Sequence, residues 1–446
     1  SILARFAKTP QLADANLRAF RAGHAYGETV EAMDAPYQIA PAKLRPGHYR
    51  NITGSTALAL GLLTAAQKAG LRLFFGSYPI TPASDVLHEL ARHRRFQVTT
   101  FQAEDEIAAI SSAIGASFGG ALGATASSGP GIALKGEAMG LAVMIELPLV
   151  IVDVQRGGPS TGLPTKTEQS DLFQAVYGRN GECPLPVLAA RSPADCFESA
   201  YEAARVAIET RTPVILLSDG AIGPGSEPWR LPEADALRPI DPQILKARPE
   251  EGFFPYARDP DTLARAWAIP GTPGLEHRVG GLEKDFTTGN ISYDALNHER
   301  MVRTRAEKVR RIADRLPPTE VSGDAEGEVL VISWGGTYGA VTQAVQEARQ
   351  AGVRAGHVHL RWILPLPNDL LAISARYRKV LVPELNLGQL RLHLRGQIGL
   401  DSHGLNKVQG KPFYVAEVRR AIEALVRRPG PAAEGATALA ARKETP

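Results

Sequence analysis

The chain has 446 residues, 44% of them hydrophobic and 22% charged, which is typical of a globular protein with room for two or three domains. Its 50 Lys and Arg against 47 Asp and Glu give a net charge of +3, which argues against a nucleic-acid-binding protein, since that class usually carries a strongly basic domain. Its two cysteines, Cys183 and Cys196, fit a reducing cytoplasm and are too few for an iron–sulfur cluster, which needs about four thiolates.

Residues 1–46 are predicted to be a helical, linker-like segment. Ala13, Leu17 and Phe20 follow helical spacing, and Pro-containing extended chain comes next. Residues 1–40 lack the apolar core of a signal peptide.

Residues 47–235 alternate between helix and strand. Short β-branched runs separated by helices are typical of a parallel sheet covered on both faces, so we predict a doubly wound α/β domain. The most apolar stretch, residues 138–154, is broken by Glu146 and Pro148, which indicates a helix and a buried strand and not a membrane span. The predicted helices are 54–69, 83–93, 107–118 and one within 129–140, and the strands are 71–76, 97–101, 123–126, 149–153 and 212–218.

Residues 236–322 read as a long connection that wraps over a neighbouring surface, with one clear helix at 301–315. We interpret the basic run 303–315 as a solvated helix face, with an anion site as the alternative. Residues 323–430 are predicted to form a second α/β domain, with strands at 329–334, 353–360 and 379–382 and a helix at 340–351. Residues 431–446, rich in Pro, Gly and Ala, are predicted to be a mobile tail.

Four strand ends in the first domain carry glycine, hydroxyl or charged residues. Ligands of open parallel sheets bind at the carboxyl edge, where strands give way to helices. One composite site is therefore expected there, built from residues 76–82, 101–106, 125–131 and 154–162.

These segments, in this order, resemble the pyrimidine-binding domain of the 2-oxoacid:ferredoxin oxidoreductases. The resemblance covers residues 50–430, and Tyr-Pro-Ile-Thr-Pro (78–82) is its most specific element. Phe-Gln-Ala-Glu-Asp-Glu (101–106), residues 128–137 and residues 158–172 resemble the 2-oxoglutarate branch. The resemblance to the family implies a thiamine-diphosphate-binding fold followed by a second domain similar to the C-terminal domain of transketolase. The first 30 residues resemble the end of the family's gamma domain, which implies a fused gamma–alpha chain whose front part is missing here.

Glu104 is the catalytic residue that the resemblance implies. In the family, a Glu at this position contacts N1′ of the coenzyme's aminopyrimidine and favours its imino tautomer, which requires a water-shielded acid with a raised pKa. The alternative is a carboxylate stabilised by the start of a helix, an interpretation that suits its neighbours Asp105 and Glu106.

Thr81 and Arg156 are implied to bind the substrate. The resemblance implies that the Thr81 hydroxyl hydrogen-bonds the 2-oxo or carboxylate oxygens of the substrate. It implies that Arg156 binds the carboxylate that every 2-oxoacid carries, because a guanidinium can donate two hydrogen bonds to a carboxylate. The alternatives are a helix-capping role for Thr81, in a turn that Ser84 or Pro82 also shapes, and a surface Arg156 paired with an acid, Asp153 or Glu168.

The remaining assignments rest on weaker patterns. Lys166, with Ser77 as a helper, is the candidate for the distal carboxylate of a five-carbon substrate, although an exposed Lys is the commoner outcome. Ser127 and Ser128 are expected to line the pocket, because glycines beside them let backbone approach a ligand. The residues expected to bind the coenzyme are Tyr78, Pro79, Ile80, Glu104, Ser127, Ser128 and Gly129.

Half of the cofactor site is expected on another polypeptide. The family pattern for Mg²⁺ and the diphosphate is a Gly-Asp-Gly turn with a later Asn, and Ser218-Asp219-Gly220 is only a partial match. In the second domain, residues 384–389 resemble a family element near a subunit contact; with Arg391 and Arg395 it is a candidate for a CoA phosphate or an interface loop.

The resemblance therefore implies a subunit of a 2-oxoglutarate:ferredoxin oxidoreductase, which forms succinyl-CoA from 2-oxoglutarate and CoA, or runs in reverse. The implied partners are a beta subunit with the Mg²⁺, the diphosphate site and an iron–sulfur cluster, and ferredoxin, in a cytoplasmic dimer of heterodimers without nucleic acid or membrane. The alternatives are pyruvate or a branched-chain 2-oxoacid as substrate, and a non-catalytic scaffold subunit.

Overall fold

The computed structural model describes residues 2–30, 40–42 and 44–427, so the predicted tail 431–446 lies outside the described residues. The chain divides into a short unit up to His48 and a large compact unit from Tyr49 onward. In the short unit, α1 (Ile2–Arg5) precedes α2 (Pro10–Thr29), which confirms the predicted helix and buries Ala13. No helix of the described residues is long and apolar enough to cross a membrane.

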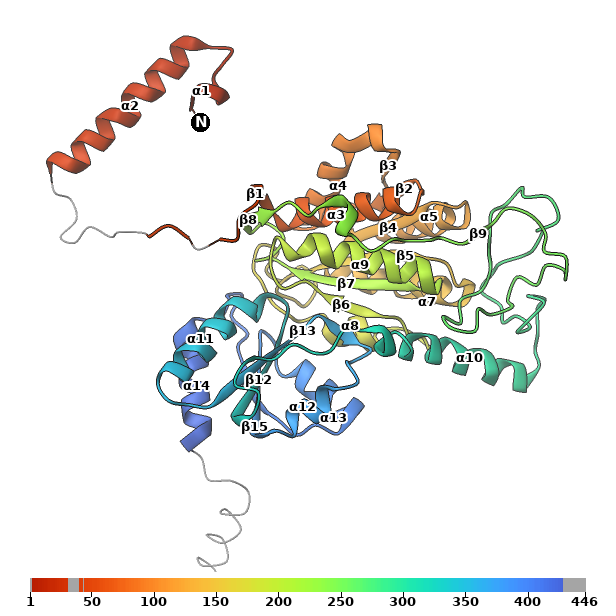
Figure 1. Ribbon diagram of the computed structural model, residues 1–446. Helices are drawn as coiled ribbons and strands as arrows, with labels where there is room; N and C mark the ends of the chain where they lie inside the picture. The colour runs from red at the N-terminus through yellow and green to blue at the C-terminus, as the bar shows by residue number, and fades with distance from the viewer. Residues whose placement is uncertain (1, 31–39, 43, 428–446) are drawn as a thin grey trace, which may run out of the picture. The chain divides into compact units, whose positions relative to one another are not determined.

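A seven-stranded sheet forms the centre of the large unit, with strand order β14-β6-β7-β5-β4-β2-β3 (Figure 1). All neighbours run parallel except β14, which is antiparallel to β6. The central strand β5 is buried along its whole length, as expected of a parallel strand with both faces covered. The strands are β2 (Leu73–Ser77), β3 (Val98–Gln102), β4 (Leu122–Ser127), β5 (Leu149–Gln155), β6 (Val187–Ala189), β7 (Pro213–Asp219) and β14 (Trp362–Leu364).

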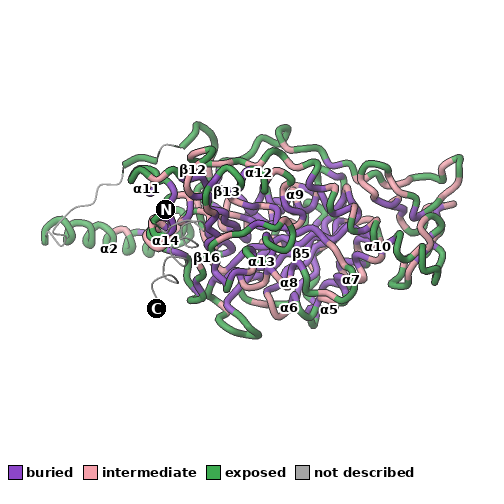
Figure 2. The backbone as a smooth tube through the Cα atoms, turned by 90° about the horizontal axis from the view of Figure 1, so that it is seen from below, coloured by how far each residue is buried: buried purple, intermediate pink, exposed green. Residues whose placement is uncertain are grey.

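Helices cover both faces of this sheet, and Figure 2 shows the buried strands between exposed helix surfaces. The small residues of α3 allow a close helix contact: a β-carbon on Gly61 would lie 2.4 Å from the carbonyl oxygen of Phe197 in α9. One face carries α3 (Gly54–Lys68), α4 (Ser84–Leu90) and α9 (Asp195–Thr210). The other carries α5 (Glu106–Phe118), α6 (Gly129–Leu134) and α7 (Gly136–Ile145), with α8 (Leu172–Tyr177) against α6.

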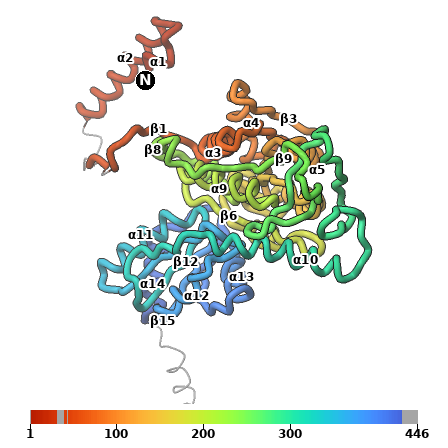
Figure 3. The backbone as a smooth tube through the Cα atoms, turned by 45° about the vertical axis from the view of Figure 1, so that its right-hand side comes forward, coloured from red at the N-terminus to blue at the C-terminus, as the bar shows by residue number. Residues whose placement is uncertain are grey.

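A second, five-stranded sheet has the order β11-β13-β12-β15-β16, parallel except for β11 (Figure 3). Its strands are β11 (Ser322–Gly323), β12 (Gly327–Trp334), β13 (Ala355–Leu360), β15 (Tyr377–Glu384) and β16 (His403–Asn406). One face carries α11 (Tyr338–Gln350) and α14 (Val415–Arg427), and α12 (Leu370–Ser374) and α13 (Gln389–Ile398) also pack on β15.

The two sheets share a hydrophobic core. Alternate residues of β12 point to opposite faces: Leu330, Ile332 and Trp334 belong to the core that continues into the large sheet, whereas Val329 and Val331 pack with α11 and α14. In addition, β14 follows β13 in sequence but completes the large sheet. The prediction of a doubly wound parallel α/β fold is confirmed, while the domain boundaries at residues 235 and 323 stay predictions.

The connection between the sheets is anchored on α7 and extends outward as long loops between β9 and α10 (Figures 1 and 3). Its helix α10 begins at Ala295, before the predicted residue 301, because Asp294 caps it by accepting from the Asn297 N–H at 2.7 Å. The connection also contains β9 (Ile244–Leu245), which pairs with β10 (Trp267–Ala268). Before the connection begins, β8 (Ser226–Arg230) pairs with β1 (Tyr49–Thr53).

The basic run on α10 is only partly the solvated face that the sequence predicted. Arg303 is exposed, but Arg305 and Lys308 are buried. Lys308 and Arg258 both bind the buried carboxylate of Glu146, which follows α7, and the neighbouring cations lower the pKa of that carboxyl against the opposing effect of burial. The interpretation was wrong for Arg305 and Lys308 because an acid distant in sequence pairs with each of them; for Arg305 it is Glu283.

Candidate active site

The four predicted segments lie at the carboxyl ends of adjacent strands. The strands β5, β4, β2 and β3 are consecutive neighbours in the sheet, and the structure pairs Ser77 with Ala126 and Gln102, and Ser127 with Asp153. The loops that follow these strands therefore gather at one edge, where the sequence predicted a composite site.

Thr81, Ser128 and Arg156 are brought together at this edge. The main-chain carbonyl of Thr81 accepts from Arg156 Nη1 at 2.6 Å and from Ser128 Oγ at 3.5 Å, and Ser128 Oγ also donates to the Val154 carbonyl at 2.8 Å. Arg156 is buried, and the Nε–H of its guanidinium has no hydrogen-bond partner within the described chain. The alternative of a surface Arg paired with Asp153 or Glu168 is wrong, because this guanidinium instead holds the turn that contains Thr81.

The turn at Thr81 is stabilised by Ser84. Its hydroxyl accepts from the Ile80 N–H at 2.8 Å and lies 3.0 Å from the Ile80 carbonyl, to which it donates. Thr81 is exposed, and its peptide bond to Pro82 is cis. The capping interpretation of Thr81 is wrong, because no described side chain caps α4 and the local hydrogen bonds of the turn come from Ser84.

Of the three neighbouring acids, Glu104 and Asp105 are exposed and Glu106 is buried. Asp105 caps α5 by accepting from the Ala108 N–H at 2.7 Å. A β-carbon on Gly131 would lie 2.9 Å from Glu106 Oε1, which shows how closely α6 approaches that acid. The helix-start interpretation therefore holds for Asp105, while Glu104 stands free to meet a ligand or a partner chain.

Ser127, Ser128 and Gly129 form the turn into α6. Ser127 is fully buried and its hydroxyl has no partner among the described residues. A β-carbon on Gly129 would lie 2.8 Å from a carboxylate oxygen of Asp171, so a larger residue there would require the Asp171 side chain to move. Buried polar atoms are normally hydrogen-bonded, and unsatisfied ones beside a tight glycine turn favour a bound polar molecule or water.

The other predicted residues differ in accessibility. Ser77 is buried, and its hydroxyl donates to the Ala126 carbonyl at 3.3 Å, which links β2 to β4. Tyr78 and Pro79 are exposed and Ile80 is half-buried. Lys166 is exposed on the loop after β5, where its carbonyl accepts from the Gly157 N–H at 3.0 Å.

Sequence reasoning missed a pair of acids behind this edge, of which Asp153 is buried and Asp171 is half-buried. Asp153 lies in β5 and Asp171 precedes α8; burial and the proximity of Asp171 raise the pKa of Asp153 well above its usual value. Burial and Glu168 raise the pKa of Asp171 to about 6, although Arg156 acts in the opposite direction. An acid near the end of a Val/Ile strand was the available signal.

Lys135 is a second missed group. Its side chain is buried, its ammonium has no hydrogen-bond partner among the described residues, and burial lowers its pKa to about 8, although Glu106 and Asp105 oppose this effect. Buried ionisable groups of both charges, the acid Asp153 and the base Lys135, therefore lie behind this edge.

Asp219, in the partial match to the diphosphate motif, is hydrogen-bonded to groups of this chain. One oxygen accepts from Thr167 Oγ1 at 2.9 Å and from the N–H groups of Ala221 and Ile222 at 2.7 and 3.0 Å. A β-carbon on Gly336 would lie 2.4 Å from its other oxygen. Nowhere in the described ranges do three or more His, Cys, Asp or Glu residues group in a way that would hold a metal ion.

A doubly wound parallel sheet with a glycine turn, an exposed acid and a buried arginine at its carboxyl edge defines a coenzyme-binding α/β protein. The family model "Pyruvate flavodoxin/ferredoxin oxidoreductase, thiamine diP-bdg" matches residues 64–292, and the model "Pyruvate:ferredoxin oxidoreductase core domain II" matches residues 327–418. The chain belongs to the 2-oxoacid:ferredoxin oxidoreductase family and is similar to its alpha subunits. This confirms the resemblance seen in the sequence and the thiamine-diphosphate-binding fold that it implied.

Relatives of the 2-oxoglutarate branch match most of the chain. The chain is 57% identical to "2-oxoglutarate oxidoreductase subunit KorA" of Mycobacterium tuberculosis over 94% of its own length and 64% of that protein. It is 35% identical to "2-oxoglutarate synthase subunit KorA" of Methanothermobacter thermautotrophicus, over 84% of this chain and 96% of the relative. The chain thus spans less than two thirds of the mycobacterial protein and nearly all of the archaeal one.

A solved structure matches both sheets. The chain superimposes with a TM-score of 0.88 and 34% identity on the 2-oxoglutarate:ferredoxin oxidoreductase from Magnetococcus marinus, solved with 2-oxoglutarate, coenzyme A and succinyl-CoA bound. The match covers 96% of this chain and 73% of that one.

Proposed function

We propose that this chain is a subunit of a 2-oxoglutarate:ferredoxin oxidoreductase. The enzyme would convert 2-oxoglutarate and CoA to succinyl-CoA and CO₂ while reducing ferredoxin, or catalyse the reverse carboxylation. The observation that carries the proposal is the gathering of Glu104, Thr81 and Arg156 at one sheet edge, on a fold that matches a relative solved with these ligands.

The edge fits one half of thiamine diphosphate. Glu104 is exposed at this edge, and the turn of Ser127, Ser128 and Gly129 offers close backbone and an unsatisfied buried hydroxyl. Tyr78, Pro79 and Ile80 would complete the wall for the ring. The bound coenzyme supplies the carbanion chemistry that decarboxylation of a 2-oxoacid requires.

Within this chain, Glu104 would hold a proton against the pyrimidine ring. In the chain by itself this carboxyl is exposed, so the water-shielded environment that such a role requires would come from a second subunit closing over the edge. Catalysis would therefore depend on assembly.

Arg156 and Thr81 would orient the substrate. A guanidinium forks onto a carboxylate, and the remaining donors of Arg156 suit the carboxylate of the oxoacid while Nη1 holds the Thr81 carbonyl. The exposed Thr81 hydroxyl would bind the same end of the substrate. Lys166 is proposed for the distal carboxylate, with Ser77 shaping the pocket from beneath through its bond to β4.

A beta subunit would supply the other half of the coenzyme site and the iron–sulfur cluster. The two cysteines are too few for an iron–sulfur cluster, and the Asp219 oxygens already accept hydrogen bonds within the chain. We therefore place the Mg²⁺, the diphosphate site and the cluster that passes electrons to ferredoxin on that partner, in a cytoplasmic dimer of heterodimers.

Replacing Glu104 by Gln tests the catalytic assignment. We expect Glu104→Gln to assemble with the beta subunit and to lose about 100-fold or more of its turnover, because a positioned proton donor contributes on that scale. Turnover and co-purification are measured together, and Glu137→Gln, at another exposed acid, is the control. Full activity in Glu104→Gln would refute the role, and a panel of 2-oxoacids would show whether pyruvate or branched-chain substrates are preferred.

A further inference from the structure

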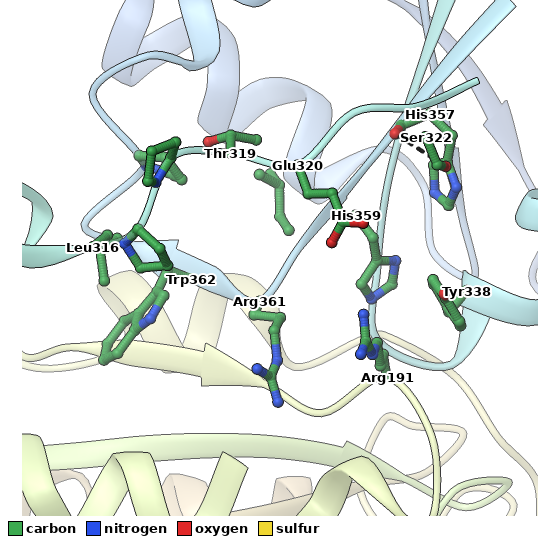
Figure 4. Close-up of a pocket in the computed structure, with 14 residues that line it drawn as sticks. Arg191, Leu316, Thr319, Glu320, Ser322, Tyr338, His357, His359, Arg361 and Trp362 are labelled. Carbon is green, nitrogen blue, oxygen red and sulfur yellow. Dashed lines mark hydrogen bonds between the residues drawn. The ribbon is translucent and has the colours of Figure 1, made fainter. Parts of the chain in front are cut away.

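Polar contacts join the second sheet to the large sheet beside their shared core. Figure 4 shows one such contact, a cavity of about 360 Å³ lined by Arg191, after β6, and Arg361, before β14. Both arginines pair with the buried carboxylate of Asp195, and Arg361 also contacts Glu198, so acids of the chain already meet these cations. Another contact, made by residues 384–389, reaches the loop after β5 and therefore bears on the candidate active site.

The loop after β5 carries two candidate substrate residues. Arg156 begins it and Lys166 lies within it, before the chain enters α8. The Gly157 N–H donates to the Lys166 carbonyl at 3.0 Å, and the Asp171 N–H donates to Gln155 Oε1 at 3.2 Å. The loop therefore returns to the end of β5, where its last residues lie beside Arg156.

Gln389, the first residue of α13, holds this returning segment with both ends of its amide. Its Nε2 donates to the Ser170 carbonyl at 2.9 Å, and its Oε1 accepts from the Phe173 N–H, also at 2.9 Å. Buried Asn386 adds a third bond, from its Nδ2 to the Gln169 carbonyl at 2.7 Å. Consecutive carbonyls of the loop, those of Gln169 and Ser170, are thus bound by side-chain amides from the second sheet.

A series of hydrogen bonds leads from Gln389 to the turn that contains Thr81. The Ser170 carbonyl binds Gln389, and the Ser170 hydroxyl donates to the Arg156 carbonyl at 3.2 Å. Arg156 Nη1 in turn donates to the Thr81 carbonyl at 2.6 Å. The main chain of Arg156 is therefore held through Ser170, and its side chain is held by the Thr81 turn.

The start of α13 is itself fixed, so that Gln389 is a rigid support. The carboxylate of buried Glu384 accepts from the N–H groups of Leu390 and Arg391 at 2.7 and 3.1 Å. The Gln389 N–H donates to Asn386 Oδ1 at 3.0 Å. A side chain on an anchored element positions its partners more precisely than one on a free loop.

Gly410 brings the second sheet against the same loop at Lys166. A β-carbon on Gly410 would lie 2.8 Å from Lys166 Cβ, and its φ of +61° also favours glycine. The loop is therefore supported from the second sheet both near its middle and at its end.

We propose that Gln389 is a positioning residue for substrate binding, a role that rests on the function proposed above. Through Ser170 it holds Arg156 where the guanidinium meets the carboxylate of the 2-oxoacid. That carboxylate loses its charge as CO₂ leaves, so a precisely held Arg156 contributes to binding more than to cleavage of the bond. Loosening Arg156 therefore raises KM and leaves kcat nearly unchanged.

Gln389→Met tests this role in the complex with the beta subunit, because Met has a similar length and makes neither amide bond. We expect KM for 2-oxoglutarate to rise about three- to tenfold, the effect of losing one or two ordinary hydrogen bonds, while kcat stays within about twofold. Gln397→Met is the matched control, since Gln397 lies on the same helix and donates to the hydroxyl of exposed Tyr177 at 3.3 Å. It should leave both constants unchanged.

Ser170→Ala removes the next bond of the series and provides a second variant. It should raise KM by a similar factor. The double variant Gln389→Met, Ser170→Ala should raise KM no more than the larger single change, because both substitutions act through the same connection to Arg156. Increases that multiply in the double variant would mean that the two side chains act independently, and would overturn the proposal.

Equal KM in Gln389→Met and Gln397→Met, or a fall in kcat with KM unchanged, would also overturn the positioning role. A lack of 2-oxoglutarate turnover by the unmodified complex is a different failure, which would refute the proposed function itself. Melting temperatures and co-purification with the beta subunit show whether each variant folds and assembles. If Gln389→Met does not fold, Ser170→Ala decides by itself, and an unchanged KM there would overturn the role.

Discussion

At the scale of single residues, Arg156 has two tasks that the sequence did not separate. Its position after a Val/Ile strand correctly predicted a guanidinium at the sheet edge. The hydrogen bond from Nη1 to the Thr81 carbonyl, however, joins residues 75 positions apart and has no local signal. The acidic pair was missed for the same reason, since the burial of Asp153 and the proximity of Asp171, which together raise its pKa, are set by the packed fold and have no local signal.

The acidic pair predicts how stability depends on pH. A carboxyl whose pKa is raised in the folded state binds its proton more tightly than in the unfolded chain. Its contribution is therefore fully present below the unfolded value of about 3.9 and is lost as the pH rises toward the folded pKa, by about 1.4 kcal/mol per pH unit for one proton. For Asp171 that window ends near a pKa of about 6; for Asp153 the folded pKa is likewise raised well above its usual value, so its contribution is also lost as the pH rises.

We expect Asp153→Asn to be more stable than the unmodified protein at pH 7.5, with a smaller difference at pH 5, because the amide carries no proton to lose. Urea unfolding at both pH values measures the change in the free energy of unfolding. Asp401→Asn, at an exposed acid, should show no such pH dependence. A variant that is equally destabilised at both pH values would show that Asp153 contributes through packing and not through its raised pKa.

At the scale of elements, hydrophobic patterning located most of the structure. The predicted strands 97–101, 123–126 and 149–153 and the helix 107–118 agree with β3, β4, β5 and α5 to within about two residues, the usual uncertainty of helix and strand ends. The sequence pattern did not predict α9 or the strands β6 and β14, and each of these two strands, with three residues, is too short to show a period. Long-range pairing, and not propensity, makes these last two strands.

The connection between the sheets depends on one buried acid. Glu146 binds Lys308 of α10 and Arg258 of the preceding loop, so Glu146→Gln leaves two buried cations without their counter-ion. Removing one partner of a buried ion pair costs about 3–5 kcal/mol. We expect a loss of that size in the free energy of unfolding, together with faster proteolysis between residues 236 and 322.

A surface pair on the same helix provides the control. Glu299 and Arg303 are both exposed, and Glu299→Gln should change the free energy of unfolding by less than about 0.5 kcal/mol. A change in the free energy of unfolding as small for Glu146→Gln as for Glu299→Gln would mean that nearby carbonyls satisfy Lys308 and Arg258. The anchoring role of Glu146 would then be wrong.

At the scale of the whole molecule, the two sheets are joined by a core and by a polar seam. The seam centres on Gln169, whose side chain donates to the Trp334 carbonyl at 2.8 Å and accepts from the Leu385 N–H at 2.9 Å. Asn386 Nδ2 donates to the Gln169 carbonyl at 2.7 Å. The element at residues 384–389, for which the sequence left a CoA contact or an interface loop open, thus forms an interface within this chain.

This seam predicts how the two sheets share stability. Gln169→Ala would remove two buried hydrogen bonds and leave the Leu385 N–H unsatisfied, at a cost of about 1–3 kcal/mol. Because the second sheet has the smaller core of its own, we expect amide hydrogen exchange to quicken more in β15 than in β5. Gln343→Ala, which removes one exposed bond of 3.2 Å to Glu347, should leave both strands protected. Equal loss of protection in both strands would instead mean that the shared core, through Leu330, Ile332 and Trp334, couples the sheets so tightly that they open only together.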